Sequence, residues 1–173
     1  MSDKPTEKDR LRTIAHYPPA VVQQVRQLLS EDRLGDYLRG KYKDRHQYNN
    51  DDALYSFTSE LKERYLKRSK PLSKALYDDR LDTVSNALGT HTRISRAHGG
   101  KLKGRNEIRI AALFKNTPTD FLRMIVVHEL AHFKEQEHNK AFYQLCCHME
   151  PGYHQLELDV RLYLLLLDAE QSL

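Results

Sequence analysis

The most informative segment of the chain is TPTDFLRMIVVHELAHF, residues 117–133. Thr117 is predicted to be the N-cap of a helix and Pro118 its first residue, with Asp120 completing a pattern like a capping box. Nearly every residue from Phe121 onward is apolar, which is typical of a helix enclosed on all sides. The run is interrupted by four polar residues: Arg123, His128, Glu129 and His132. Because two buried imidazoles and a carboxylate are costly to desolvate, a bound cation would compensate all three.

His128, Glu129 and His132 form an H-E-x-x-H pattern. Residues four apart lie on one helical face with Cβ atoms roughly 5–6 Å apart, so the two histidines can hold one metal ion. Glu129 lies about 100° further round the helix, where it can act on water without ligating the metal. Two imidazoles suit Zn²⁺, which in a catalytic site has a third protein ligand and an open position for water. The pattern therefore predicts a catalytic zinc site.

His138 is the first candidate for the third ligand, because its six-residue spacing from His132 is the one that metzincins use. Along a continuous helix this residue would point away from the other two, so the chain must leave the helix before it. A metzincin has glycine where this chain has Glu135, so the turn must be made differently. Asn139 then offers an N-cap for a new helix whose apolar face holds Phe142, Leu145, Cys146 and Met149.

Glu157 is the competing third ligand, since a glutamate from a later helix completes the His₂Glu site of thermolysin. Asp159, His148 and His154 are further alternatives. We interpret the two carboxylates as the polar face of an amphipathic C-terminal helix, and the two histidines as residues outside the ligand set.

The pattern as a whole resembles a known family. The resemblance covers roughly residues 91–155 and is carried by Arg109-Ile110, Pro118, Val126–His132, His138–Phe142 and Pro151-Gly152-Tyr153. These segments resemble the YgjP-like metallopeptidase domain, a small bacterial zincin group similar to the SprT-like and WLM minimal metalloproteases. The resemblance implies that His128, His132 and His138 ligate zinc and that Glu129 is the general base. It also favours His138 over Glu157.

The composition indicates an ordinary soluble protein. With 173 residues, 39% hydrophobic and 30% charged, the chain is predicted to form a single domain over residues 1–173. Residues 1–17 are expected to be a flexible N-terminus, 18–89 a helical part, and 90–173 the zincin-like core. Two adjacent cysteines, Cys146 and Cys147, are badly placed to bridge each other, which favours the cytoplasm. Leu162–Leu167 is too short to span a membrane.

Periodicity predicts the remaining elements. Helices are expected after Pro18-Pro19 with a stop at Gly35, over 51–68, and less regularly over 72–88. Two β-branched, alternating runs at 90–96 and 106–111 flank a glycine-rich turn and predict an antiparallel hairpin. The expected fold class is α+β and zincin-like: N-terminal helices, a short antiparallel sheet, the H-E-x-x-H helix and C-terminal helices.

The hairpin is strongly basic. Its turn region carries Arg93, Arg96, Lys101, Lys103 and Arg105. The charge predicts either a docking surface for a nucleic acid or another polyanion, or a solvated edge that avoids aggregation. The net charge of +4 favours the second interpretation.

We expect a zinc metallopeptidase that cleaves a peptide or protein substrate. Zinc polarises the scissile carbonyl and acidifies water, and Glu129 accepts the proton. Tyr143, Tyr153 and His154 are candidates for stabilising the oxyanion. One alternative is a metal-dependent nucleotide phosphohydrolase, which an all-histidine site disfavours because Mg²⁺ prefers oxygen ligands. The other is a non-enzymatic nucleic-acid or protein-binding module with a structural zinc, in which Glu129 has no chemical task.

Overall fold

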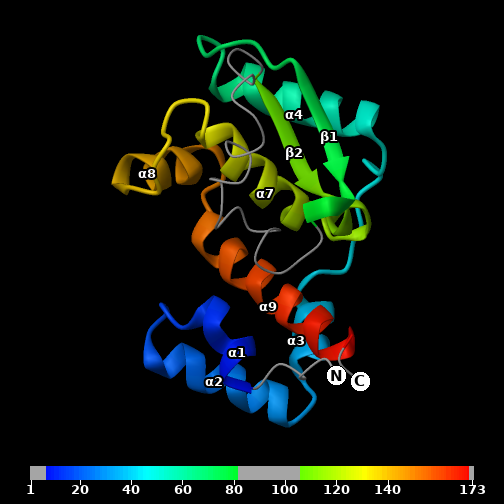
Figure 1. The fold of residues 1–173 in the computed structure, drawn as a ribbon, viewed down its shortest axis with the longest axis vertical. Helices are drawn as coiled ribbons and strands as arrows, with labels where there is room; N and C mark the ends of the chain where they lie inside the picture. The colour runs from blue at the N-terminus through cyan, green and yellow to red at the C-terminus, as the bar shows by residue number, and fades with distance from the viewer. Residues whose placement is uncertain (1–6, 82–105, 172–173) are drawn as a thin grey trace. The chain divides into compact units, whose positions relative to one another are not determined.

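The computed structural model describes residues 7–81 and 106–171 (Figure 1). The chain divides into two compact units. One unit consists of the described residues up to Lys43 together with those from Glu157 onward, and the other spans Asp44–Leu156. The single domain expected over 1–173, with its parts 18–89 and 90–173, stays a prediction.

The first unit is helical. It contains α1 (Glu7–Arg10), the 3₁₀ turn η1 (Leu11–Ile14), α2 (Pro19–Ser30), α3 (Leu34–Lys41) and the part of α9 (Tyr153–Gln171) that begins at Glu157. Asp159 of α9 is fully buried and accepts hydrogen bonds from Lys41 Nζ, at 2.7 Å, and from the Tyr42 hydroxyl. These bonds compensate the buried carboxylate and fix α9 to the end of α3.

Two details of this unit differ from the sequence-based expectation. Leu11 and Ile14, in the segment expected to be flexible, are buried. Gly35, predicted to stop the first helix, lies inside α3, because α2 already ends at Ser30. The chain reverses between them at Asp32, which has a positive φ of 53°.

The second unit packs helices against a two-stranded sheet. It contains α4 (Asp51–Tyr65), β1 (Lys74–Asp78), η2 (Asp79–Leu81), β2 (Glu107–Ala111), η3 (Ala112–Asn116), α7 (Thr119–Ala131) and α8 (Lys140–Met149). Figure 1 shows β1 and β2 side by side; α4 contacts β1 and α7 contacts β2. The α+β class is therefore confirmed.

The sheet in the described residues is parallel, whereas we predicted an antiparallel one. β2 forms as expected, but its partner is β1, and the strands are parallel, with Lys74 opposite Glu107 and Asp78 opposite Ala111. The residues of β1 fall in the 72–88 stretch that we expected to be helical, and that expectation is wrong at 74–78. Alternate residues of both strands, including Tyr77 and Ile110, are buried, so tertiary packing overrides the weak local propensity. The expected partner at 90–96 lies outside the described residues.

A charged cluster closes the end of β1. Asp78 is buried and accepts two hydrogen bonds from the Arg80 guanidinium, at 2.9 and 2.7 Å, one from the Arg80 backbone N–H, at 3.0 Å, and one from Arg109, at 2.9 Å. The hydrogen bonds from Arg80, and the one from Arg109, hold the pKa of Asp78 far below its usual range. Burial acts in the opposite direction but is outweighed. Asp78 is thus a charged anchor between the two strands.

Helix α7 is enclosed as predicted, with Phe121, Leu122, Met124–His128, Leu130 and Ala131 buried. Its N-cap is Pro118 rather than Thr117, whose hydroxyl bonds Phe114 O at 3.0 Å instead. The buried His46 also secures this end of the helix, because its Nε2 donates to Phe114 O at 2.7 Å and its backbone N–H to Thr117 O at 3.3 Å.

Candidate metal centre

His128 and His132 come from the end of α7. His128 lies in the last turn of the helix and is buried, while His132 is the C-cap and is half-buried. The helix ends here through hydrogen bonds from the backbone N–H groups of Lys134 and Glu135 to Ala131 O, at 3.1 and 2.9 Å. Both side chains therefore sit where the chain leaves the helix.

His138 returns to the same place from the following turn. The expectation that the chain leaves the helix before His138 is confirmed, since no helix spans residues 132–139. Asn139 caps α8 as predicted, because its side chain accepts a hydrogen bond from Phe142 N at 2.9 Å. His138 is thus held between the end of one helix and the start of the next, with its ring exposed.

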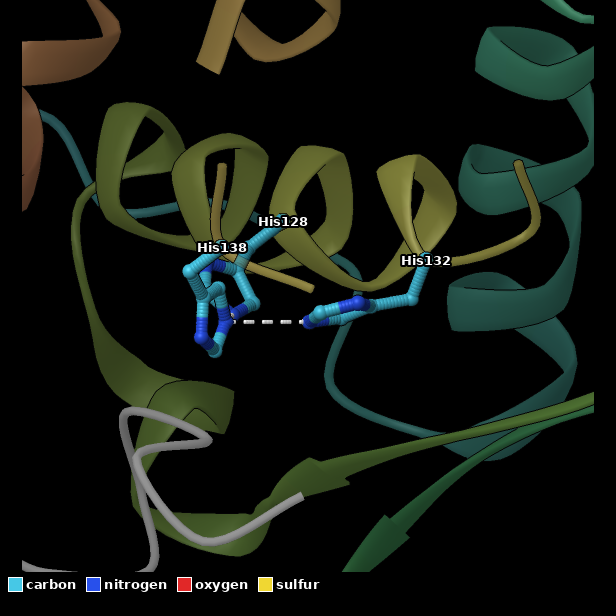
Figure 2. Close-up of side chains that lie close together, drawn as sticks. All are labelled: His128, His132 and His138. Carbon is cyan, nitrogen blue, oxygen red and sulfur yellow. Dashed lines mark hydrogen bonds between the residues drawn. The ribbon is translucent and has the colours of Figure 1, made fainter. Parts of the chain in front are cut away.

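The three imidazoles converge, as Figure 2 shows. His138 Nε2 lies 3.2 Å from His128 Nε2 and 3.1 Å from His132 Nε2. Within residues 7–81 and 106–171, these three side chains form the group of three His, Cys, Asp or Glu residues that is spaced to hold a metal ion. One side of the group is buried and the other reaches solvent, which leaves room for a substrate to approach.

The hydrogen bonds of the rings decide whether a cation fits. His132 Nδ1 lies 2.9 Å from Glu135 O. A carbonyl oxygen only accepts, so Nδ1 carries the proton and Nε2 of the neutral ring presents a lone pair. His132 therefore turns a lone pair toward the Nε2 atoms of His128 and His138, where one cation could be shared by the three rings. The donor set fits a metal ion, and three imidazoles with an open side fit a catalytic zinc site.

Phe142 packs against all three rings. It is fully buried, and its ring centroid lies 5.0 Å from that of His128, 4.6 Å from His132 and 4.8 Å from His138. We predicted Phe142 as a core residue of α8 and did not assign it to the site. Its position gives the three ligands a common apolar support.

Tyr153 bonds the far side of the His128 ring. Its hydroxyl lies 2.7 Å from His128 Nδ1, and the Tyr153 side chain is fully buried. This overturns Tyr153 as an oxyanion candidate, because Nδ1 is on the opposite edge of the ring from Nε2. Tyr143 and His154, the other two candidates, contact each other with ring centroids 5.5 Å apart.

Glu129 is half-buried in α7 next to His128. Without a metal charge beside it, burial raises the pKa of Glu129 to about 7. A carboxyl group with a pKa near neutrality can both accept and return a proton at physiological pH. The role of Glu129 as general base stays a prediction.

The other candidate ligands have other partners. Glu157 pairs with Arg161 at 3.0 Å, and Asp159 bonds Lys41 and Tyr42. Both carboxylates are buried, so they do not form the solvent-facing polar side of α9 that we expected. His148 is exposed and contacts the Tyr65 ring edge-on, with centroids 5.6 Å apart. The basic residues Arg93, Arg96, Lys101, Lys103 and Arg105 lie outside the described residues. In the part of the chain that is described, no helix is long and apolar enough to cross a membrane.

Comparison with known proteins gives two matches. The family model described as YgjP-like, metallopeptidase domain, matches residues 30–161. The chain is also 55% identical over 156 residues to the UTP pyrophosphatase of Escherichia coli (strain K12), an alignment that covers 90% of this chain and 93% of that protein. No solved structure matches.

Proposed function

We propose that this chain, which belongs to the YgjP-like metallopeptidase domain family and is a metal-dependent hydrolase, cleaves UTP to UMP and pyrophosphate. The family predicted from residues 91–155 is confirmed, and its match is longer, over 30–161. The observation that carries the substrate is the 55% identity to a UTP pyrophosphatase, which extends over 90% of the chain. The alternative that we ranked second on the sequence thus becomes the first.

The three-histidine cluster supports a single metal-binding role for His128, His132 and His138. The convergence of their Nε2 atoms and the protonation of His132 Nδ1 both favour a bound cation. We propose Zn²⁺, because imidazole ligands with an open position suit it. A metal ion held there supplies a Lewis acid that polarises a substrate oxygen and acidifies water.

Glu129 is the proposed general base. Water adds to the α-phosphorus, its proton passes to the Glu129 carboxylate, and the bond from that phosphorus to the oxygen bridging the α- and β-phosphates breaks. Pyrophosphate then leaves. The half-buried position of Glu129, next to His128 in α7, suits a group that must exchange protons with a substrate.

The all-histidine site is compatible with phosphate chemistry. We disfavoured a nucleotide phosphohydrolase because Mg²⁺ prefers oxygen ligands, but that preference concerns a magnesium ion bound by the protein. A nucleoside triphosphate can bring its own Mg²⁺ on its phosphate oxygens, while the imidazoles hold a different metal. The three histidines therefore limit which metal ion the protein binds, but they do not decide which substrate it cleaves.

Peptide hydrolysis is the second candidate. The H-E-x-x-H pattern, the third histidine and the description of the family as a metallopeptidase domain favour it. The same Lewis acid and the same carboxylate base would serve attack on a peptide carbonyl. The two candidates share Glu129 and differ only in the substrate.

A direct comparison of substrates tests the proposal. Protein loaded with Zn²⁺ is incubated with UTP in the presence of Mg²⁺, and ³¹P NMR follows the products. UMP and pyrophosphate are expected, at a rate that Glu129→Gln abolishes. Parallel incubations with CTP and ATP report base preference, and incubation with casein reports peptidase activity. Cleavage of casein by protein that leaves UTP intact would replace our first candidate with the second, and release of UDP and phosphate would place the cut at the wrong anhydride.

A further inference from the structure

Tyr153 is the residue whose position the proposed chemistry does not explain. It is the first residue of α9 and has no exposed surface. Its hydroxyl lies 2.7 Å from His128 Nδ1, across 25 residues of sequence. A buried hydroxyl needs a hydrogen-bond partner. Because the partner here is a metal-binding ring, the bond also affects how that ring binds a metal.

The turn that carries Tyr153 is fastened to α7 at a second point. Tyr153 N donates to Glu150 O at 2.9 Å, and the Glu150 side chain accepts from Gly152 N at 3.1 Å. The same Glu150 carboxylate pairs with Arg123 of α7 at 3.5 Å. Arg123 is one of the four polar residues that interrupt the apolar run of this helix, and the ion pair gives it a role. The turn before α9 is thus held on α7 through Arg123 and through His128.

The direction of the Tyr153 hydrogen bond follows from the metal. An imidazole that ligates through Nε2 must present its lone pair there, so its proton is on Nδ1. Nδ1–H then donates to the phenol oxygen of Tyr153. The opposite arrangement, in which the phenol donates to Nδ1, places the proton on Nε2 and blocks ligation. When a metal is bound, the phenol oxygen of Tyr153 accepts this proton and holds His128 in the tautomer that binds metal.

We propose that Tyr153 is a positioning residue of the metal centre: it fixes the tautomer and orientation of His128, and the Arg123–Glu150 pair holds Tyr153 in place. The inference rests on the metal-binding part of the proposed function and not on the substrate. Partners of this kind fix the ring and strengthen binding, and their loss typically weakens metal affinity about 10–100-fold.

The chain offers a matched control at Tyr77. This tyrosine is also buried, and its hydroxyl donates to the backbone oxygen of Tyr48 rather than to a ligand. Tyr77→Phe and Tyr153→Phe each remove one phenol oxygen and the hydrogen bond that it makes. A merely structural role for Tyr153 predicts that the two variants behave alike.

The test compares the metal affinities of the parent protein and the two variants. Each is stripped with a chelator, and Zn²⁺ binding is measured by competition with a chromophoric chelator. Tyr153→Phe is expected to bind about 10–100-fold more weakly, and Tyr77→Phe to bind as the parent does. With Co²⁺ as the metal, the visible absorption spectrum should change in Tyr153→Phe only, because the orientation of one ligand has changed. Equal affinities and identical spectra in all three proteins would overturn the proposal, whatever substrate the enzyme has.

A measurement on the unaltered protein covers the case in which Tyr153→Phe does not fold. Long-range ¹H–¹⁵N NMR of the histidine side chains in the Zn²⁺-loaded protein should find a proton on His128 Nδ1 that exchanges slowly with solvent. Tyr77→Phe should leave that signal in place. A proton on Nε2 of His128, or a rapidly exchanging Nδ1 proton, would contradict the assigned hydrogen bond.

Discussion

Replacing His138 by alanine tests the metal centre most directly. Its Nε2 is the atom that lies within 3.2 Å of both other imidazoles, so the substitution removes the nitrogen that joins the cluster. The ring is exposed and belongs to a turn, and α7 and α8 have their own hydrogen bonds. We therefore expect the fold to survive and the metal to be bound by the remaining pair alone.

The size of the effect follows from the number of ligands. Structural zinc sites with four ligands bind with about 10–16 kcal/mol, or roughly 3–4 kcal/mol for each ligand. At about 1.4 kcal/mol for each factor of ten, removing His138 should weaken Zn²⁺ binding by about 10²–10³-fold. Thermal unfolding of the metal-free variant should match that of the metal-free parent, because the lost ring is exposed.

The assay is Zn²⁺ competition with a chelator, with two variants beside His138→Ala. His148→Ala removes another exposed histidine, from α8, and is expected to bind Zn²⁺ as the parent does. Glu157→Gln removes the rival third ligand, whose carboxylate pairs with Arg161, and should also leave Zn²⁺ binding intact. A His138→Ala protein that keeps its zinc, together with a Glu157→Gln protein that loses it, would refute the ligand assignment.

Three further predictions follow from the described contacts. Glu129→Gln should keep the fold and the metal content and lower kcat about 10²–10⁴-fold, since an amide cannot accept the proton; unchanged UTP turnover would exclude Glu129 as the base. Zn²⁺ affinity should fall as the pH drops below about 6.5, because ligating imidazoles must be neutral, and a chelator titration that is flat between about pH 5 and 8 would argue against histidine ligands. Asp78→Asn should lower the free energy of unfolding by about 1–2 kcal/mol at neutral pH, because Arg80 and Arg109 lose a charged partner. The effect is no larger because both arginines are exposed, and solvent weakens their interaction with Asp78. The pKa of the Asp78 carboxyl is lowered in the folded protein. The stabilisation is therefore present above the unfolded carboxyl pKa of about 4 and is lost as the pH falls below it. A free energy of unfolding that still differs between the two proteins in acid would contradict this.

Local patterns were enough to predict the centre of the site. The i, i+4 spacing of His128 and His132 fixes two side chains on one face of a helix, whatever surrounds that helix. The cap at Asn139 is equally local, since its side chain bonds a backbone N–H three residues ahead. The placement of His138 between these two signals could therefore be expected before any tertiary structure was known. The resemblance to the family supported the same choice.

The pairing of the strands could not be predicted from local sequence patterns. The alternation of residues 106–111 identifies a strand, but a strand's hydrogen-bond partner is another segment that the pattern does not name. We expected pairing with the neighbouring run at 90–96, which lies outside the described residues, and the structure pairs β2 with the distant β1, in parallel. A parallel pair needs a long crossover connection, so its two strands are far apart in sequence and no short turn signal joins them.

Residue types and spacing were enough to predict a helix that carries two histidines and a glutamate, a break after that helix, and a third histidine at the spacing of a metal ligand. How those ligands are held depends on packing between segments far apart in the chain. Phe142 of α8 lies against all three rings, and the Tyr153 hydroxyl bonds His128 Nδ1 from the start of α9. Neither contact can be predicted from a pattern in the sequence, because each depends on how separate helices pack. The identity of a ligand is a matter of its own chemistry and spacing, while its orientation depends on residues that the fold brings to it.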